Sequence, residues 1–233
     1  MLHRQTDERI KIIVMEKEIN LLINYPKSKR NISERENEKS EEDRRIAREF
    51  GKDFFDGNRK HGYGGFYYNP RFWQTVIKDF KKYWNLNSSS SVLDVGCGKG
   101  FMLYDLAKLI PKITIKGIDI SKYAIDNAIP EIKKNLVIGD ASKLPFADNS
   151  FDVVISINTV HNLKKKECMQ ALQEIKRVSK KYSFITVDAF RNDEEKKRMF
   201  AWNLTAQTIM SVKDWKLFFK ESNYDGDYYW FIP

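Results

Sequence analysis

One stretch constrains the fold more than any other part of the chain: Val92-Leu93-Asp94-Val95-Gly96-Cys97-Gly98-Lys99-Gly100. An apolar, β-branched run ends at an acidic residue and then breaks into three glycines at alternate positions. This pattern predicts a buried strand that turns sharply into a helix beside a ligand, because glycine lets the backbone come close to another group.

Spacing distinguishes this turn from two other glycine-rich loops. A nucleoside triphosphate loop needs Ser or Thr after Gly-Lys, but Gly100 follows Lys99. A dinucleotide fingerprint needs a glycine at the position of Phe101. The remaining pattern, Asp-x-Gly-x-Gly-x-Gly after a strand, resembles motif I of the class I S-adenosylmethionine-dependent methyltransferases. An ordinary tight turn between a strand and a helix remains the alternative.

From Ser91 onward, strand and helix signals alternate, which predicts an α/β fold with a Rossmann-like, doubly wound sheet. We expect the sheet to be mostly parallel, with an antiparallel C-terminal strand. The expected strands are residues 92–95, 114–120, 136–139, 153–158, 182–187 and 228–232. The main expected helices are residues 73–83, 103–110, 165–178 and 193–199, and a last one capped by Ser211.

Residues 1–72 are expected to form an N-terminal helical extension, and residues 73–233 the methyltransferase domain. A first helix is predicted from Asp7 to Tyr25, and a second over residues 33–50, with Ser33 as N-cap and Glu36 completing a capping box. Residues 50–73 combine many glycines and aromatic rings, which predicts an ordered loop. This loop either closes over a pocket or only holds the extension on the core. The extension either covers the catalytic domain or pairs two subunits as a homodimer.

Ligands of an open α/β sheet lie beyond the carboxyl ends of its strands. Asp119 is placed there to accept hydrogen bonds from both ribose hydroxyls, and Ile120 to cover one adenine face; the alternative for Asp119 is a helix N-cap. The resemblance implies S-adenosyl-L-methionine as cofactor and S-adenosyl-L-homocysteine as product. The cofactor-binding residues that we expect are Asp94, Gly96, Cys97, Gly98, Gly100, Asp119, Ile120, Asp140, Ala141 and Asn158.

The acceptor is expected beside the strand that ends at Asn158. His161 follows this strand and is the candidate general base, because an imidazole takes up a proton near neutral pH. A histidine that only binds substrate or packs in the loop is the alternative. Asp188 is the second candidate catalytic residue, with helix capping as its alternative. The candidate substrate-binding residues are His61, Tyr63, Tyr67 and Tyr68.

Composition limits the partners. The 233 residues carry a formal net charge of +9, but the basic clusters are scattered, which favours a solvated lysine-rich surface and makes nucleic acid an unlikely partner. Two cysteines are too few for a disulfide framework or a zinc site, and no compact cluster predicts a metal. The sequence contains no membrane-length apolar run and no signal-peptide pattern at its start, so we expect a cytoplasmic protein.

Three functions are compatible with the sequence. The first is a small-molecule methyltransferase, with an oxygen acceptor favoured by His161 and an anionic metabolite such as a surface-glycan precursor favoured by the charge. The second is an RNA methyltransferase, although Ser156 to Thr159 replace the Asn-Pro-Pro-aromatic pattern used on base amino groups. The third is a non-catalytic S-adenosylmethionine-binding protein. The aromatic segment and the Asp-Tyr-Tyr-Trp ending resemble a bacterial subgroup of the family.

Overall fold

The apolar runs predicted as strands pair into one parallel sheet in the computed structural model, which describes residues 17–26 and 39–233. The strand order is β3-β2-β1-β4-β5-β6, and β7 also pairs with β5. The strands are β1 (Ser91–Val95), β2 (Thr114–Asp119), β3 (Leu136–Ile138), β4 (Phe151–Ile157), β5 (Ser179–Phe190), β6 (Met210–Ser211) and β7 (Asp227–Phe231).

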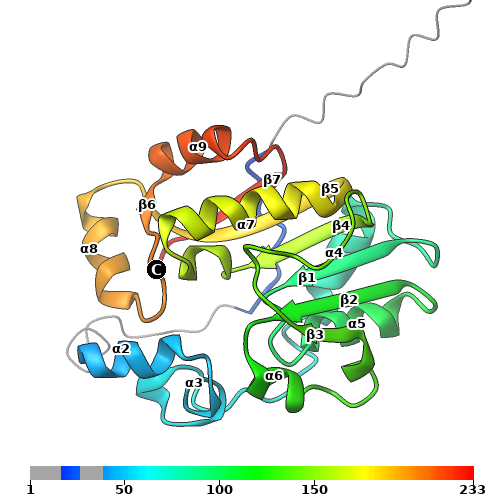
Figure 1. The fold of residues 1–233 in the computed structure, drawn as a ribbon, viewed down its shortest axis with the longest axis horizontal. Coiled ribbons are helices and arrows are strands. Elements are labelled where there is room, and N and C mark those ends of the chain that lie inside the picture. Colours follow the sequence, from blue (N-terminus) through cyan, green and yellow to red (C-terminus); the bar gives the residue numbers. More distant parts are fainter. Residues whose placement is uncertain (1–16, 27–38) are drawn as a thin grey trace, which may run out of the picture.

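Helices cover both faces of the sheet (Figure 1). The first face packs against α4 (Gln74–Tyr83), α5 (Phe101–Leu109) and α6 (Lys122–Asp126), and the second against α7 (Lys165–Val178) and α9 (Val212–Glu221). Side chains alternate between the two cores, since Val92 enters the first, while Leu93 and Val95 enter the second. Burial on both faces explains why the central strands β1 and β4 are largely apolar.

The predicted antiparallel C-terminal strand is wrong. Strand β7 runs parallel to β5, with Phe184 opposite Asp227 and Asp188 opposite Phe231. The short strand β6, which the sequence did not reveal, is also parallel to β5. The reason is that α9 lies between β6 and β7 and returns the chain to the side of the sheet where the parallel strands begin. A helical crossover produces a parallel pair, whereas a hairpin would have produced an antiparallel one.

The first predicted helix, Asp7 to Tyr25, lies partly outside the described residues, and its described part is not helical. Glu18 forms a parallel β-bridge to Tyr228, and Ile19 N–H donates to the Tyr228 carbonyl at 3.0 Å. Residues 21–24 then form a turn. The open edge of β7 offers unpaired backbone groups, so tertiary pairing overrides the local helical pattern. The predicted homodimer through this region stays a prediction.

The second predicted helix is α2 (Glu41–Arg48). Ser40 is its N-cap and forms a capping box with Asp43, whereas the predicted caps, Ser33 and Glu36, lie outside the described residues. The aromatic stretch, predicted as a loop, contains the short helix α3 (Lys52–Asp56) and the 3-10 turn η1 (Arg59–His61). Further short turns are η2 (Lys133–Asn135) and η3 (Val160–Asn162).

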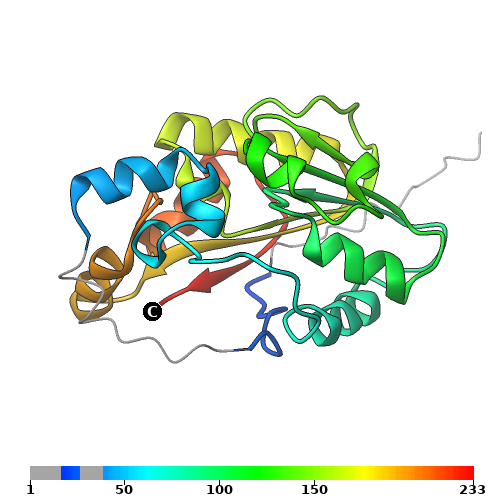
Figure 2. The same cartoon turned by 90° about the horizontal axis from the view of Figure 1, so that it is seen from below.

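The extension lies at the carboxyl ends of the parallel strands. Figures 1 and 2 both place α2 and α3 there, beside α8 (Asp193–Trp202). Arg44 donates to the Asn203 carbonyl, and the Lys39 ammonium donates to the Trp202 carbonyl at 2.6 Å. The extension therefore contacts the end of α8, at the carboxyl ends of the strands where α/β proteins bind their ligands.

Candidate functional site

The glycine turn has the backbone that its sequence predicts. Its φ angles are +84° at Gly96, +54° at Gly98 and +79° at Gly100, all in the left-handed region. A Cβ at Gly96 would lie 2.1 Å from the Oγ1 atom of Thr159. The chain that leaves β4 therefore crosses so close to the turn that only glycine fits at this position.

Asp119, at the end of β2, is held by the turn. Gly98 N–H donates to its Oδ2 at 2.7 Å, and Ser121 N–H donates to its Oδ1 at 2.8 Å. Each carboxylate oxygen retains a second lone pair, so Asp119 is fixed in place and can still accept two hydrogen bonds. The side chain that caps α6 is that of Ser121, so the alternative prediction for Asp119 is wrong.

Two large apolar side chains are exposed beside these carboxylates. Ile120 is 58% exposed after β2, and Ile138 is 50% exposed at the end of β3. Asp140 is exposed nearby in sequence, and its Oδ1 accepts from Ser142 N–H at 2.8 Å, while Ala141 is half-buried against the core. An apolar surface beside acceptor oxygens is the chemistry that a nucleoside requires.

Two acids lie at the turn: Asp94, which is buried, and Asp119, which is half-buried. Burial, with a smaller contribution from Asp119, raises the pKa of Asp94 to about 8, and burial also raises the pKa of Asp119. No cationic side chain of the described residues forms an ion pair with either carboxyl. This arrangement favours a ligand that brings positive charge. Burial also raises the pKa of the Cys97 thiol, which favours its prediction as a small packing residue over a nucleophile.

The two predicted catalytic residues lie side by side. His161 lies in η3 and is buried beside Asp188. Asp188 N–H donates to His161 Nδ1 at 2.9 Å, and an Asp188 carboxylate oxygen lies 3.7 Å from the same atom. Burial lowers the pKa of His161, although Asp188 opposes this. Since Nδ1 is the acceptor, the proton of the neutral ring lies on Nε2, which then acts as a donor. Asn158 is exposed, and its carboxamide oxygen accepts from Thr186 Oγ1 at 2.9 Å.

The four candidate substrate residues of the extension have different surroundings. His61 Nε2 lies 3.0 Å from Asp43 Oδ1. Tyr63 is 41% exposed and Tyr67 is 74% exposed. Tyr68 turns toward α5 instead, where its hydroxyl donates to Asp105 at 2.6 Å. Tyr63 and Tyr67 are therefore the members of this set whose side chains are most open to a ligand.

Comparison with known proteins decides the family. Residues 86–225, more than half of the chain, match a family described as a methyltransferase domain. The chain belongs to this family. Its cofactor is S-adenosylmethionine, as the glycine turn predicts.

The malonyl-[acyl-carrier protein] O-methyltransferase of Legionella pneumophila is 31% identical over 120 residues, which are 50% of this chain and 42% of that protein. The YcgJ protein of Bacillus subtilis has the same fold, with a TM-score of 0.51 and 20% identity, over 63% of this chain and 66% of that one. Phosphoethanolamine N-methyltransferase 2 of Haemonchus contortus, solved with S-adenosylhomocysteine, gives a TM-score of 0.55 at 18% identity, over 76% of this chain and 44% of that one. The chain thus spans less than half the length of the Legionella relative.

The residues of this methyltransferase fit its cofactor. Asp119 retains the lone pairs that two ribose hydroxyls need, and Ile120 and Ile138 offer apolar surface to the adenine ring. The buried carboxyl of Asp94, which has no ion-pair partner among the described residues, suits a ligand that carries a sulfonium and an ammonium group. The left-handed glycines keep the backbone free of side chains on this side.

Sequence reasoning missed Lys99, Asp56 and Thr159. Lys99 lies inside the motif, where the pattern leaves its position unspecified, yet its ammonium forms a buried ion pair with Asp56. Asp56 belongs to the aromatic stretch, and no local signal identifies the partner of its carboxylate. Thr159 could have been suspected only from its place after a strand that ends at the same edge as β1.

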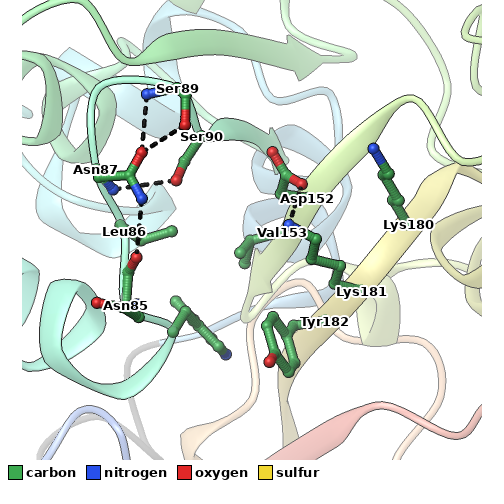
Figure 3. Close-up of a pocket in the computed structure, with 11 residues that line it drawn as sticks. Asn85, Leu86, Asn87, Ser89, Ser90, Asp152, Val153, Lys180, Lys181 and Tyr182 are labelled. Atoms are coloured by element: carbon green, nitrogen blue, oxygen red, sulfur yellow. Dashed lines mark hydrogen bonds and ion pairs between the residues drawn. The ribbon is translucent and has the colours of Figure 1, made fainter.

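A polar pocket of about 480 Å³ lies at the other side of the sheet, at the amino ends of the strands (Figure 3). Asn87, Ser89 and Ser90 face Asp152 and Lys181 across it. Asn87 Oδ1 accepts from the Ser89 hydroxyl at 2.6 Å, and Lys181 lies 2.9 Å from Asp152. These groups satisfy one another, and the pocket is remote from the glycine turn.

Within residues 17–26 and 39–233, no helix is both long and apolar enough to cross a membrane. The same residues contain no group of three or more His, Cys, Asp or Glu side chains that could hold a metal ion.

Proposed function

We propose that this methyltransferase transfers the methyl group of S-adenosylmethionine to an oxygen of an anionic small molecule, and that this oxygen belongs to a carboxylate group. The bound cofactor supplies an electrophilic methyl group. The protein then has to hold the acceptor in line and keep water away, which contributes several kcal/mol to lowering the barrier. The hydrogen bond from Asp188 N–H to His161 Nδ1 carries this proposal.

That hydrogen bond fixes which proton chemistry His161 supports. A neutral ring that accepts at Nδ1 donates at Nε2, and no group of the described part of the chain accepts from this Nε2. His161 therefore orients the acceptor by donating to it. The base role predicted from the sequence needs the opposite tautomer. A carboxylate is already ionised at neutral pH and needs no base, so it matches a site whose histidine is a donor.

Two further observations support an anionic oxygen acceptor. The chain carries a net charge of +9, which attracts anions to the protein. The Legionella relative is by name an O-methyltransferase. A surface-glycan precursor with a carboxylate belongs to the proposed acceptor class.

Labelled methyl transfer tests the substrate class. The protein is incubated with methyl-labelled S-adenosylmethionine and cell extract separated into RNA, protein and small-molecule fractions. We expect label in small acids, as methyl esters that mild base releases as methanol. Label confined to RNA would establish the RNA methyltransferase alternative instead. Cofactor binding without label in any fraction would favour a non-catalytic binding protein.

Two substitutions at His161 then separate the donor from the base. Gln has an amide N–H that can replace Nε2–H, whereas Ala has none. We expect His161→Gln to retain turnover within about fivefold and His161→Ala to lose at least about tenfold, the range of a lost hydrogen bond to a charged group. Affinity for S-adenosylhomocysteine should stay unchanged in both. If Gln is as inactive as Ala, and wild-type turnover falls as His161 becomes protonated, His161 is the base.

A further inference from the structure

A buried ion pair joins the extension to the cofactor loop. The Lys99 ammonium lies 2.7 Å and 2.9 Å from the two carboxylate oxygens of Asp56. The exposed fractions of these side chains are only 6% for Lys99 and 13% for Asp56. Removing one partner of such a pair leaves an uncompensated charge in a buried place, so the pair holds its two segments together firmly.

Asp56 and Lys99 also organise the aromatic stretch around them. Phe66 N–H and the Tyr123 hydroxyl donate to Asp56 at 2.9 Å and 2.7 Å, and Lys99 donates to the Phe66 carbonyl at 2.9 Å. The chain on both sides of η1 is therefore tied to one point of the glycine turn. The Phe66 ring stacks on Phe101, with centroids 4.8 Å apart.

The neighbouring residue in the turn holds the predicted ribose ligand. Gly98 N–H donates to Asp119, and a Cβ at Gly98 would lie 3.4 Å from the Phe66 ring and 3.6 Å from the Phe55 ring. Two consecutive residues thus face different partners, since Gly98 holds Asp119, while Lys99 holds the extension. Adjacent residues of the turn thus connect Asp119 to Asp56.

The extension has anchors on the other side as well. Ser121, which donates its N–H to Asp119, donates its hydroxyl to the Phe50 carbonyl at 2.5 Å. Arg48 donates to the Thr205 carbonyl at 3.4 Å, next to the Arg44 contact described above. The extension therefore spans from the end of β2 to the segment after α8, across the edge of the sheet (Figure 2).

We propose that Lys99 and Asp56 are positioning residues that couple cofactor binding to docking of residues 50–68. The docked extension then forms part of the cofactor site. By thermodynamic linkage, the cofactor stabilises the docked extension by the same factor by which the docked extension strengthens cofactor binding. This inference rests on the cofactor and is independent of the proposed acceptor.

Hydrogen exchange and calorimetry with S-adenosylhomocysteine test the coupling without any turnover. In the wild type, S-adenosylhomocysteine should slow amide exchange of residues 50–68 at least tenfold. In Lys99→Met and in Asp56→Asn, we expect about tenfold weaker S-adenosylhomocysteine binding and loss of this protection. The Lys99→Met/Asp56→Asn double variant should bind no more weakly than either single variant, because both remove the same link.

Two controls keep the test decisive. Lys122→Met removes an exposed lysine, next to Ser121, whose ion-pair partner is Asp126. This change should leave cofactor binding and amide protection unchanged. Lys99→Arg keeps the cation and should retain most of the coupling, and Asp56→Asn carries the test if Lys99→Met does not fold. Wild-type affinity and protection in a folded Lys99→Met variant would overturn the inference, as would S-adenosylhomocysteine binding to the wild type without protection of residues 50–68. Absence of methyl transfer to small acids would affect only the proposed function.

Discussion

The surroundings of Asp152, at the amino edge where the strands begin, differ from those of Asp94, at the carboxyl edge where the strands end. At the amino edge, burial raises the pKa of Asp152, but hydrogen bonds from Lys181 and Ser91 outweigh it and lower this pKa overall. At the carboxyl edge, burial raises the pKa of Asp94 to about 8, and no hydrogen bond or ion pair compensates. Asp152 is paired within the chain, whereas Asp94 has no partner among the described residues and can accept a cationic ligand. This contrast favours the carboxyl edge as the cofactor-binding side.

The largest effect is expected from Asp119→Ala. Two charge-assisted hydrogen bonds to ribose are lost, each contributing about 1.5–3 kcal/mol, so affinity for S-adenosylhomocysteine should fall at least about 100-fold. Calorimetric titration measures this. Asp152→Ala, at the opposite edge, is the matched control and should bind as the wild type does. Equal losses in the two variants would contradict the distinction between the edges.

A smaller effect, with a defined pH dependence, is expected from Asp94→Asn. The pKa of Asp94 is about 8 in the folded protein and about 4 in the unfolded chain. Its contribution to stability is therefore fully present below about pH 4 and is lost as the pH rises to about 8. The unliganded variant should melt a few degrees above the wild type at pH 9 and show less difference at pH 5. Melting curves at both pH values test this.

The same variant should respond less to the cofactor. A cationic ligand favours the ionised form of Asp94, so wild-type affinity for S-adenosylmethionine should rise between pH 6 and pH 9. Asp94→Asn cannot ionise and should show a flatter profile. A parallel profile in both proteins would mean that Asp94 does not face the charge of the ligand.

The smallest effect is expected from Asp152→Asn. This change weakens the hydrogen bonds from Ser91 and the contact with Lys181, and should lower the free energy of unfolding by about 1 kcal/mol. Because the pKa of Asp152 is lowered, its contribution is present above the unfolded pKa and is lost as the pH falls. Urea denaturation at pH 7 and pH 3 should therefore show a larger difference at pH 7 than at pH 3. An equal difference at both pH values would indicate that packing, and not charge, is the cause.

Local sequence determined the glycine turn of this methyltransferase and, through it, the family and the cofactor. Motif I, Asp119 and Asp140 lie within a continuous stretch of sequence, and each lies at or just after the end of a strand. The glycine turn needs left-handed backbone, and three glycines at alternate positions are a signal that needs no alignment to interpret. The predictions of α7 as residues 165–178 and of Ser211 as a helix cap were confirmed for the same reason.

Tertiary structure decided the rest. The direction of β7 depended on a crossover through α9, and the pairing of residues 17–19 depended on the edge that β7 left open. The tautomer of His161 was set by the backbone of Asp188, which is 27 residues away in sequence. The partner of Lys99 was Asp56, which is 43 residues away. Local sequence patterns reflect backbone conformations that neighbouring residues require. The partners of buried charges, by contrast, come from distant parts of the chain, so only the tertiary structure shows which residues they are.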